Sequence, residues 1–264
     1  MQPLAVRVAE SRGYEISYED AGAGPVVVLV NGFASPAAEW RKYGYVDRLA
    51  DRYRVLAVDS LGHGHSATPH DADAYRAPEV AADVVAVMDA AGIDRAAVWG
   101  YSRGGWLAAM IAAEHPDRVA TLITGGWAAP GLSPDSDTVR PRTIALLNGD
   151  WPAFWNALGF PVPDEDRRYM EAMSDPRALG AVDLARLRSP YKIDLERITA
   201  PSLLYCGAQD MSTPQFASEL RATAAALNTD PQVLPGDHDH ITAFTDTDCV
   251  LDVVDPHLSA IRTW

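Results

Sequence analysis

The stretch from Ala96 to Glu114 constrains the fold more than any other part of this 264-residue chain. Residues 96–101 form an apolar run of strand length, and residues 104–114 are rich in alanine, as in a helix packed closely on a sheet. Between them, Gly100-Tyr101-Ser102-Arg103-Gly104 has the pattern Gly-x-Ser-x-Gly. A strand that turns sharply into a helix strains the turn residue, and flanking glycines remove the Cβ atoms that would clash. The pattern therefore predicts a serine hydroxyl raised above the strand ends, near a helix N-terminus.

Apolar runs of strand length alternate with helical patterns on both sides of this stretch. We expect strands at residues 4–9, 14–18, 26–30, 53–58, 96–101, 119–124, 201–206 and 232–234, and helices at 37–51, 78–91, 104–114, 213–228 and 246–261. This alternation is typical of an α/β fold with a mostly parallel sheet flanked by helices. In such a fold, functional side chains lie in the loops at the carboxyl ends of the strands.

Residues 131–199 interrupt the alternation. They contain short helical patterns broken by prolines and no evident strand. We therefore predict a core domain of residues 1–130 and 200–264, and a helical lid of residues 131–199 inserted after the sixth strand. Aromatic residues of the insertion such as Trp151 and Trp155 either form its own small core or line a pocket over Ser102, and both roles stay open.

Composition and charge exclude several classes of partner. The formal charge of −14 argues against nucleic acid or an anionic membrane, since both need a basic face, and it weakly disfavours strongly anionic substrates. No apolar stretch approaches the ~20 residues of a membrane span, and the first residues lack a signal-peptide pattern. Two cysteines make no disulfide framework. We expect a cytoplasmic protein that binds a small-molecule substrate, with its oligomeric state left open.

Two later residues complete a plausible reaction centre with Ser102. A serine hydroxyl is a poor nucleophile at neutral pH, so it needs a base within hydrogen-bond reach, and the base needs an orienting carboxylate. Asp210 follows one predicted strand directly, and His240 follows the next. The chain order Ser102, Asp210, His240 is the order expected when the serine lies on a strand-to-helix turn of such a sheet. We predict these three residues to be catalytic.

These motifs resemble those of the serine hydrolases of the α/β-hydrolase fold, in the lidded group of small esterases, lactonases, cofactor-free haloperoxidases and C–C hydrolases. The similarity covers nearly the whole chain outside the lid. The matching segments are Asn31-Gly32-Phe33, Asp59-x-x-Gly62-His63-Gly64-x-Ser66, Gly100–Gly104, Gly207-x-x-Asp210 and Asp239-His240-Ile241-Thr242-Ala243-Phe244. The resemblance implies a sheet of about eight strands, with Ser102 as nucleophile, His240 as general base and acid, and Asp210 as the orienting acid.

The resemblance also implies an oxyanion hole, formed by the backbone N–H groups of Phe33 and Arg103. Two fixed donors are needed near the oxygen that gains charge. The chain departs from the common pattern at two positions. Asn31 stands where many relatives have histidine, and Arg103 stands where an apolar or amide residue is commoner. The Arg103 side chain either points away and pairs with an acid or brings positive charge close to the pocket.

Other polar residues compete for these roles. His238 lies in the same loop as His240, but only His240 matches the Asp-His-x-x-Ala-Phe ending. We expect Asp59 to brace the Gly62–Gly64 turn and the histidines of that turn to be structural. The His-x-Asp-x-His loop resembles a metal site, but no further ligand cluster of suitable spacing accompanies it, so we predict no metal and no cofactor.

The sequence thus predicts a hydrolase that cleaves a carboxylic ester or a lactone through an acyl-enzyme. Substrates are expected to be small to medium and largely apolar, because Trp127 follows a strand end and the lid is aromatic. Pocket residues are expected to be Asn31, Tyr101, Trp127, Trp151 and Trp155. Perhydrolysis, C–C bond hydrolysis and lyase chemistry use the same three catalytic residues and stay open, as does a ligand receptor with little or no turnover.

Overall fold

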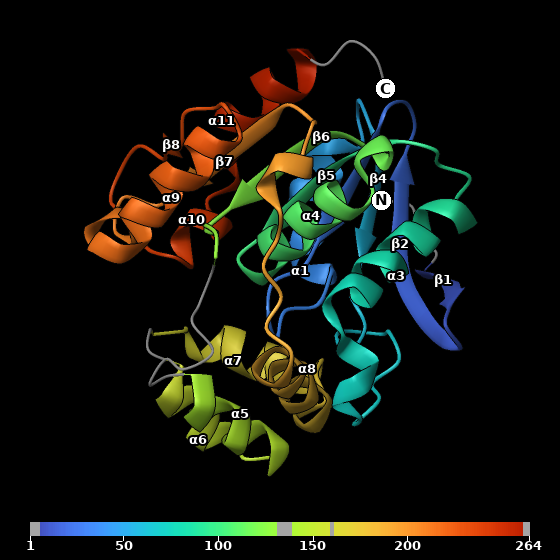
Figure 1. Ribbon diagram of the computed structural model, residues 1–264, viewed down its shortest axis with the longest axis vertical. Helices are drawn as coiled ribbons and strands as arrows, with labels where there is room; N and C mark the ends of the chain where they lie inside the picture. The colour runs from blue at the N-terminus through green and yellow to red at the C-terminus, as the bar shows by residue number, and fades with distance from the viewer. Residues whose placement is uncertain (1–5, 131–138, 159–160, 261–264) are drawn as a thin grey trace.

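The computed structural model describes residues 6–130, 139–158 and 161–260. The strands in these residues form one eight-stranded sheet in the order β1-β2-β4-β3-β5-β6-β7-β8 (Figure 1). The first two neighbouring pairs along this order are antiparallel, and all later pairs are parallel. The strands are β1 (Val6–Ser11), β2 (Tyr14–Gly22), β3 (Val26–Val30), β4 (Arg54–Val58), β5 (Ala96–Tyr101), β6 (Val119–Gly125), β7 (Ser202–Cys206) and β8 (Gln232–Val233).

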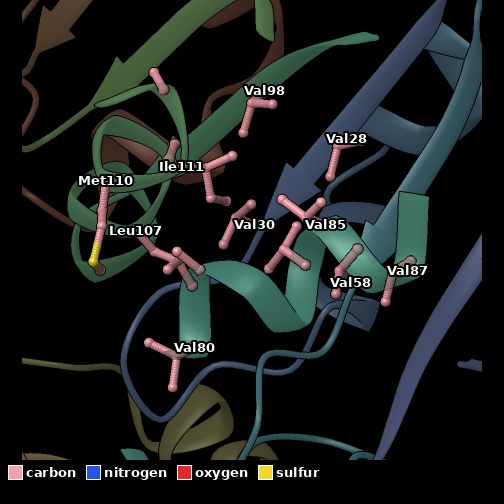
Figure 2. Packing of buried hydrophobic residues seen from close by; sticks show 14 of the residues in the cluster. Val28, Val30, Val58, Val80, Val85, Val87, Val98, Leu107, Met110 and Ile111 are labelled. Carbon is pink, nitrogen blue, oxygen red and sulfur yellow. The ribbon is translucent and has the colours of Figure 1, made fainter. Parts of the chain in front are cut away.

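Alternate residues of the central strands pack on opposite faces of the sheet. In β3, Val28 and Val30 lie in the core formed with α3 (Ala77–Ala90) and α4 (Arg103–Glu114). Figure 2 shows these two valines among side chains of both helices, with Val85, Leu107 and Ile111 close to Val30. Val27 and Leu29 lie in the second core, formed with α2 (Tyr45–Leu49) and α11 (Thr247–Ala260). Burial on both faces explains why β3 is a continuous apolar run.

The remaining helices complete the two outer layers. They are α1 (Ala38–Lys42), α2 (Tyr45–Leu49), α9 (Pro214–Ala226), α10 (Thr242–Thr245) and α11 (Thr247–Ala260), with short 3-10 turns η1 (Ala72–Tyr75), η2 (Pro116–Arg118), η3 (Leu195–Arg197) and η4 (Asp210–Ser212). Within the described ranges, no helix has both the length and the apolar character needed to cross a membrane.

The described residues between β6 and β7 include four α-helices, which we call the inserted helices: α5 (Val139–Leu147), α6 (Trp151–Ala157), α7 (Asp164–Ala172) and α8 (Pro176–Arg188). Figure 1 shows them grouped at one end of the molecule. Phe154 of α6 lies 6.3 Å from Phe33, ring centre to ring centre, and Val182 of α8 lies against Gly62. The inserted helices therefore cover the loops that follow β3 and β4. The division into a core and a lid domain at residues 131 and 199 stays a prediction.

Sequence-based boundaries are accurate for local elements and less so elsewhere. β5 runs over the predicted residues, and α3 and α4 begin within one residue of the prediction. The single helix predicted at 37–51 is wrong, because Gly44 adopts a φ of 88° and separates α1 from α2. The short α10 before the last helix was not predicted. Residues 4–5 of the first predicted strand and residue 261 of the last predicted helix lie outside the described residues.

Candidate active site

Ser102 lies between β5 and α4 in the strained turn that the sequence predicts. Its φ is 55°, in the left-handed region, and its N–H donates to the Gly125 carbonyl oxygen at 2.8 Å. A Cβ atom on Gly100 would overlap the Gly104 carbonyl, and one on Gly104 would overlap the Val30 carbonyl. The predicted reason for both glycines is therefore confirmed. The turn leaves Ser102 partly exposed at the carboxyl end of β5.

His240 is the histidine that the fold brings to Ser102. Its Nε2 lies 3.0 Å from Ser102 Oγ, within hydrogen-bond distance. Tyr101 fixes the backbone of the histidine, since its hydroxyl donates to the His240 carbonyl oxygen at 2.7 Å. His238 lies elsewhere, with its Nε2 3.0 Å from Asp246 Oδ2. The two histidines of this loop thus have separate surroundings.

Asp210 approaches the far side of the same imidazole. It begins η4, directly beyond β7, and its Oδ1 lies 3.5 Å from His240 Nδ1. The other carboxylate oxygen accepts the Gly207 N–H at 3.4 Å. Contacts of this kind are often long in an enzyme without substrate and shorten when substrate binds. A hydroxyl, an imidazole and a carboxylate therefore meet in sequence at the carboxyl ends of β5, β7 and β8.

The loop after β3 lies beside Ser102. A Cβ atom built on Gly32 would be 4.0 Å from Ser102 Cβ, so Phe33 follows at the edge of the same site. In the described part of the chain, the N–H groups of Phe33 and Arg103 donate to no acceptor. The first N–H groups of a helix have no partner within the helix, which leaves the Arg103 N–H free to bind a ligand oxygen. The placement suits the predicted oxyanion hole.

Asn31 does not line the pocket in this structure. It is buried, and its Oδ1 accepts hydrogen bonds from the Ser60 N–H and the Ser60 hydroxyl, both at 3.1 Å. Its Nδ2 donates to the Ser35 carbonyl oxygen. The side chain thus joins the loop after β3 to the loop after β4, and it holds the backbone that precedes Phe33.

The loop after β4 is braced as the sequence predicts. Asp59 is buried, and its carboxylate accepts the N–H of Ala37 at 2.6 Å and that of His65 at 3.0 Å. His63 is fully buried, and burial together with the nearby Arg103 lowers its pKa to about 3. His63 is therefore uncharged at neutral pH. These contacts leave Asp59 and His63 in structural roles.

The predicted aromatic pocket residues are dispersed. Tyr101 is buried under His240, and Trp127 is buried against Gly105. Trp151 and Trp155 stack on each other, with ring centres 5.7 Å apart, and Trp155 Nε1 donates to Glu171 at 2.5 Å. A hollow of about 380 Å³ lies between α6 and α7; its lining includes Trp155 and none of the three predicted catalytic residues. These two tryptophans pack mainly within the inserted helices.

Phe154 is the aromatic residue that the sequence did not single out. It is fully buried and lies between Trp151 and Phe33, with ring centres 5.5 Å and 6.3 Å away. Its position between two tryptophans on a short helix was visible in the sequence. Which of the three rings faces the core depended on how α6 docks, and a seven-residue helix has no clear periodicity.

The only grouping of potential metal ligands found in the described residues lies outside this centre. Ligand atoms of His238, Asp246 and Cys249 all lie within 4.8 Å of one another. His238 Nε2 is already hydrogen-bonded to Asp246. None of its three residues takes part in the described contacts of Ser102.

The fold and the site define the class of protein. The family model described as the α/β-hydrolase fold matches residues 25–242. The chain belongs to this family and is a hydrolase. The expected fold class and the family resemblance are confirmed.

Particular relatives differ in their named substrates. The chain is 30% identical over 254 residues to a provisionally named carbamate hydrolase, RutD, of Caulobacter segnis, covering 89% of this chain and 91% of the relative. It is 37% identical over 134 residues to a pimeloyl-[acyl-carrier protein] methyl ester esterase of Aeromonas hydrophila, a match that covers 50% of each chain. Among solved structures, the enol-lactonase of Burkholderia xenovorans has a TM-score of 0.81 at 24% identity, covering 96% of this chain and 100% of that one. At that identity the likeness shows the fold alone.

Proposed function

We propose that this protein hydrolyses a carboxylic ester or a lactone by way of an acyl-enzyme, with Ser102 as nucleophile, His240 as base and acid, and Asp210 as the orienting carboxylate. The observation that supports this most is the 3.0 Å contact between Ser102 Oγ and His240 Nε2, in a strained turn that leaves Ser102 partly exposed. A serine with its base in reach is the arrangement needed for acyl transfer.

The proposed reaction has two halves. Ser102 Oγ attacks the carbonyl carbon while its proton passes to His240 Nε2, and the carbonyl oxygen becomes an oxyanion held by the N–H groups of Phe33 and Arg103. The C–O bond to the alcohol then breaks, and the alcohol leaves with the proton from His240. Water next gives a proton to His240 and attacks the acyl carbon. The acid departs as the proton returns to Ser102.

The identities of the relatives suit this proposal without selecting one substrate. An esterase and a provisionally named carbamate hydrolase are both among them. Ester, lactone and carbamate share a carbonyl carbon with a leaving group, so one substrate panel should include all three. The proposal needs a small-molecule substrate and no cofactor. The same panel would reveal perhydrolysis as turnover that requires hydrogen peroxide. It would reveal C–C cleavage as turnover of a β-diketone.

Replacing the nucleophile tests the proposal. Ser102→Ala should lower kcat on a 4-nitrophenyl ester by roughly three orders of magnitude or more, because the acyl-enzyme no longer forms. A sulfonyl fluoride should label the wild-type protein at Ser102, and peptide mass mapping locates the adduct. The control Ser218→Ala changes an exposed serine of α9 and should keep wild-type turnover. Undiminished ester turnover in Ser102→Ala contradicts the proposal.

The neighbouring histidines provide a matched pair. His240→Gln removes the base beside Ser102 and should reduce kcat by about a thousandfold or more. His238→Gln changes a side chain bonded to Asp246 and should stay within about threefold of wild type. Equal losses in the two variants would mean that the 3.0 Å contact of His240 is not the catalytic one.

A further inference from the structure

The Arg103 side chain has no acidic partner in the described parts of the chain. Its Nη1 donates to the Ser60 hydroxyl oxygen at 3.3 Å, and its Cζ lies 6.0 Å from the centre of the Trp106 ring. Ser60 in turn donates to Asn31. The residue as a whole is partly exposed. Of the two roles that the sequence left open, pairing with an acid is therefore not what the structure shows.

The surroundings of this guanidinium are cationic. Its charged neighbours include Asp183, Arg186 and Arg142, and the Asp183 carboxylate is bonded to Arg142 through both oxygens, at 2.7 and 2.8 Å. Burial, with the nearby charges of Arg186 and Arg142, lowers the pKa of Arg103 to about 10, so the group still carries its charge at neutral pH. A partly buried cation with cationic neighbours favours binding of an anion.

Arg103 belongs to the turn that carries the proposed reaction centre. Arg103 is the residue after Ser102, and its backbone N–H is a proposed oxyanion donor. Phe33, the other proposed donor, has the Arg142 guanidinium 4.9 Å from its ring centre, and its ring is 6.0 Å from that of His63. Arg142 of α5 thus lies against the ring of Phe33. Each of the two residues proposed as oxyanion donors therefore carries or contacts an arginine side chain.

We infer that the Arg103 guanidinium binds an anionic group of the substrate, a carboxylate or a phosphate, so that the ester or lactone cleaved here is itself an anion. This rests on the proposed function for the position of the reacting carbonyl. A guanidinium presents paired N–H donors that match two oxygens of such a group. The net charge of −14 is a sum over the whole chain and weakly disfavours anionic substrates. Binding at the site, however, depends on the charged groups near it.

Two esters of matched length test the inference in the wild-type protein. Mono-4-nitrophenyl glutarate carries a carboxylate at the far end of its acyl chain, and 4-nitrophenyl pentanoate does not. We expect kcat/KM to be at least about tenfold higher for the glutarate ester, chiefly through a lower KM, because a charge-assisted hydrogen bond forms in the bound state. A preference for the uncharged ester overturns the inference.

Variants of Arg103 assign the preference to one side chain. Arg103→Met keeps the length and the backbone N–H but removes the charge, and it should reduce the ratio of the two kcat/KM values about tenfold or more. Arg103→Lys keeps a charge without the paired donors and should recover part of the ratio. Arg188→Gln changes an exposed arginine at the end of α8 and should leave the ratio unchanged. An unchanged ratio in Arg103→Met overturns the inference, whatever happens to the absolute rates.

Binding measurements separate this inference from the proposed function and identify the anion. Glutarate and inorganic phosphate are each tested as inhibitors of 4-nitrophenyl pentanoate hydrolysis and as ligands that raise the Tm of Ser102→Ala. Stronger action of glutarate indicates a carboxylate site, and stronger action of phosphate indicates a phosphate site. Absence of both effects, or equal effects on Ser102→Ala and the Ser102→Ala/Arg103→Met double variant, overturns the inference. If neither ester is hydrolysed, the proposed function fails, while the Tm measurement still tests the anion site.

Discussion

The pKa of Glu39 shows how strongly the surroundings of a single ionisable group change its protonation. It is a buried carboxyl group in α1, and Ser35, in the loop that contains Phe33, donates its hydroxyl to it. Burial raises the pKa of Glu39 to about 7. The folded protein therefore favours the protonated form of this group, whereas the unfolded chain releases the proton near pH 4.5.

The pH dependence of stability should reveal this group. Because the folded-state pKa is raised, the free energy of unfolding falls as pH rises from about 4.5 through 7, by at most about 3 kcal/mol from this residue. Glu39→Gln keeps a side chain that can bond to Ser35 and cannot ionise. Urea unfolding of both proteins at pH 5 to 8 should show the variant gaining stability relative to wild type as pH rises. Parallel pH curves would contradict the raised pKa.

Residue types and chain order were enough to predict which side chains meet at the site. Ser102, Asp210 and His240 each follow a strand, and parallel strands end at one edge of the sheet. The surroundings of Arg103 were not predictable, because Arg142 and Asp183 come from helices far along the chain. Asn31 was expected in the pocket, but its amide instead bonds to Ser60, a residue of the next loop.

At the scale of elements, β5 and α4 form the most tightly specified unit of the molecule. All of β5 is buried, and α4 approaches it so closely that a Cβ atom on Gly100 of β5 would overlap the Gly104 carbonyl of α4. Both elements are continuous in sequence, so their apolar and small residues directly predict a buried strand followed by a closely packed helix. The split between α1 and α2 was missed because the pattern of residues 37–51 is helical on either side of Gly44.

Alanine substitutions at two glycines distinguish the cost of a steric overlap from the cost of a strained backbone conformation. Gly104→Ala places a Cβ atom onto the Val30 carbonyl and should destabilise the protein by about 3 kcal/mol or more. Gly92→Ala is the control: its φ is 69° and no atom lies within 4 Å of the added Cβ, so only the strained conformation is felt, at about 1 kcal/mol. Chemical denaturation measures both. Equal losses would mean that the approach of α4 to β3 is looser than described.

At the scale of the whole molecule, the inserted helices pack on the rest of the protein through residues of α8 in the main core and through a second, smaller apolar cluster. Ala145, Leu146, Phe154 and Leu179 of these helices pack with Ala34 from the loop after β3. Lys42 of α1 adds an ion pair to Asp166 of α7 at 2.5 Å. Two contacts therefore hold the loop that supplies Phe33. Asn31 ties it to the loop after β4, and Phe154 packs on it from the inserted helices.

Removing Phe154 should weaken both the fold and the site. Phe154→Ala leaves a cavity beside Phe33 and should destabilise the protein by about 3–5 kcal/mol in urea unfolding. Ester kcat/KM should fall as well, because the Phe33 N–H loses its support. The control Ile144→Ala changes a side chain of α5 that is 61% exposed and should cost less than about 0.5 kcal/mol. A Phe154→Ala protein with wild-type stability would show that α6 does not pack as described.

The sequence by itself determined the sheet, the strained serine turn and the set of residues that meet there, because these follow from local patterns and from the order of strands. Only the tertiary structure decided the electrostatics around Arg103 and which aromatic ring of α6 faces Phe33. Both depend on how the inserted helices dock on the loops after β3 and β4. Docking is set by contacts between residues far apart in the chain, and no local pattern encodes them.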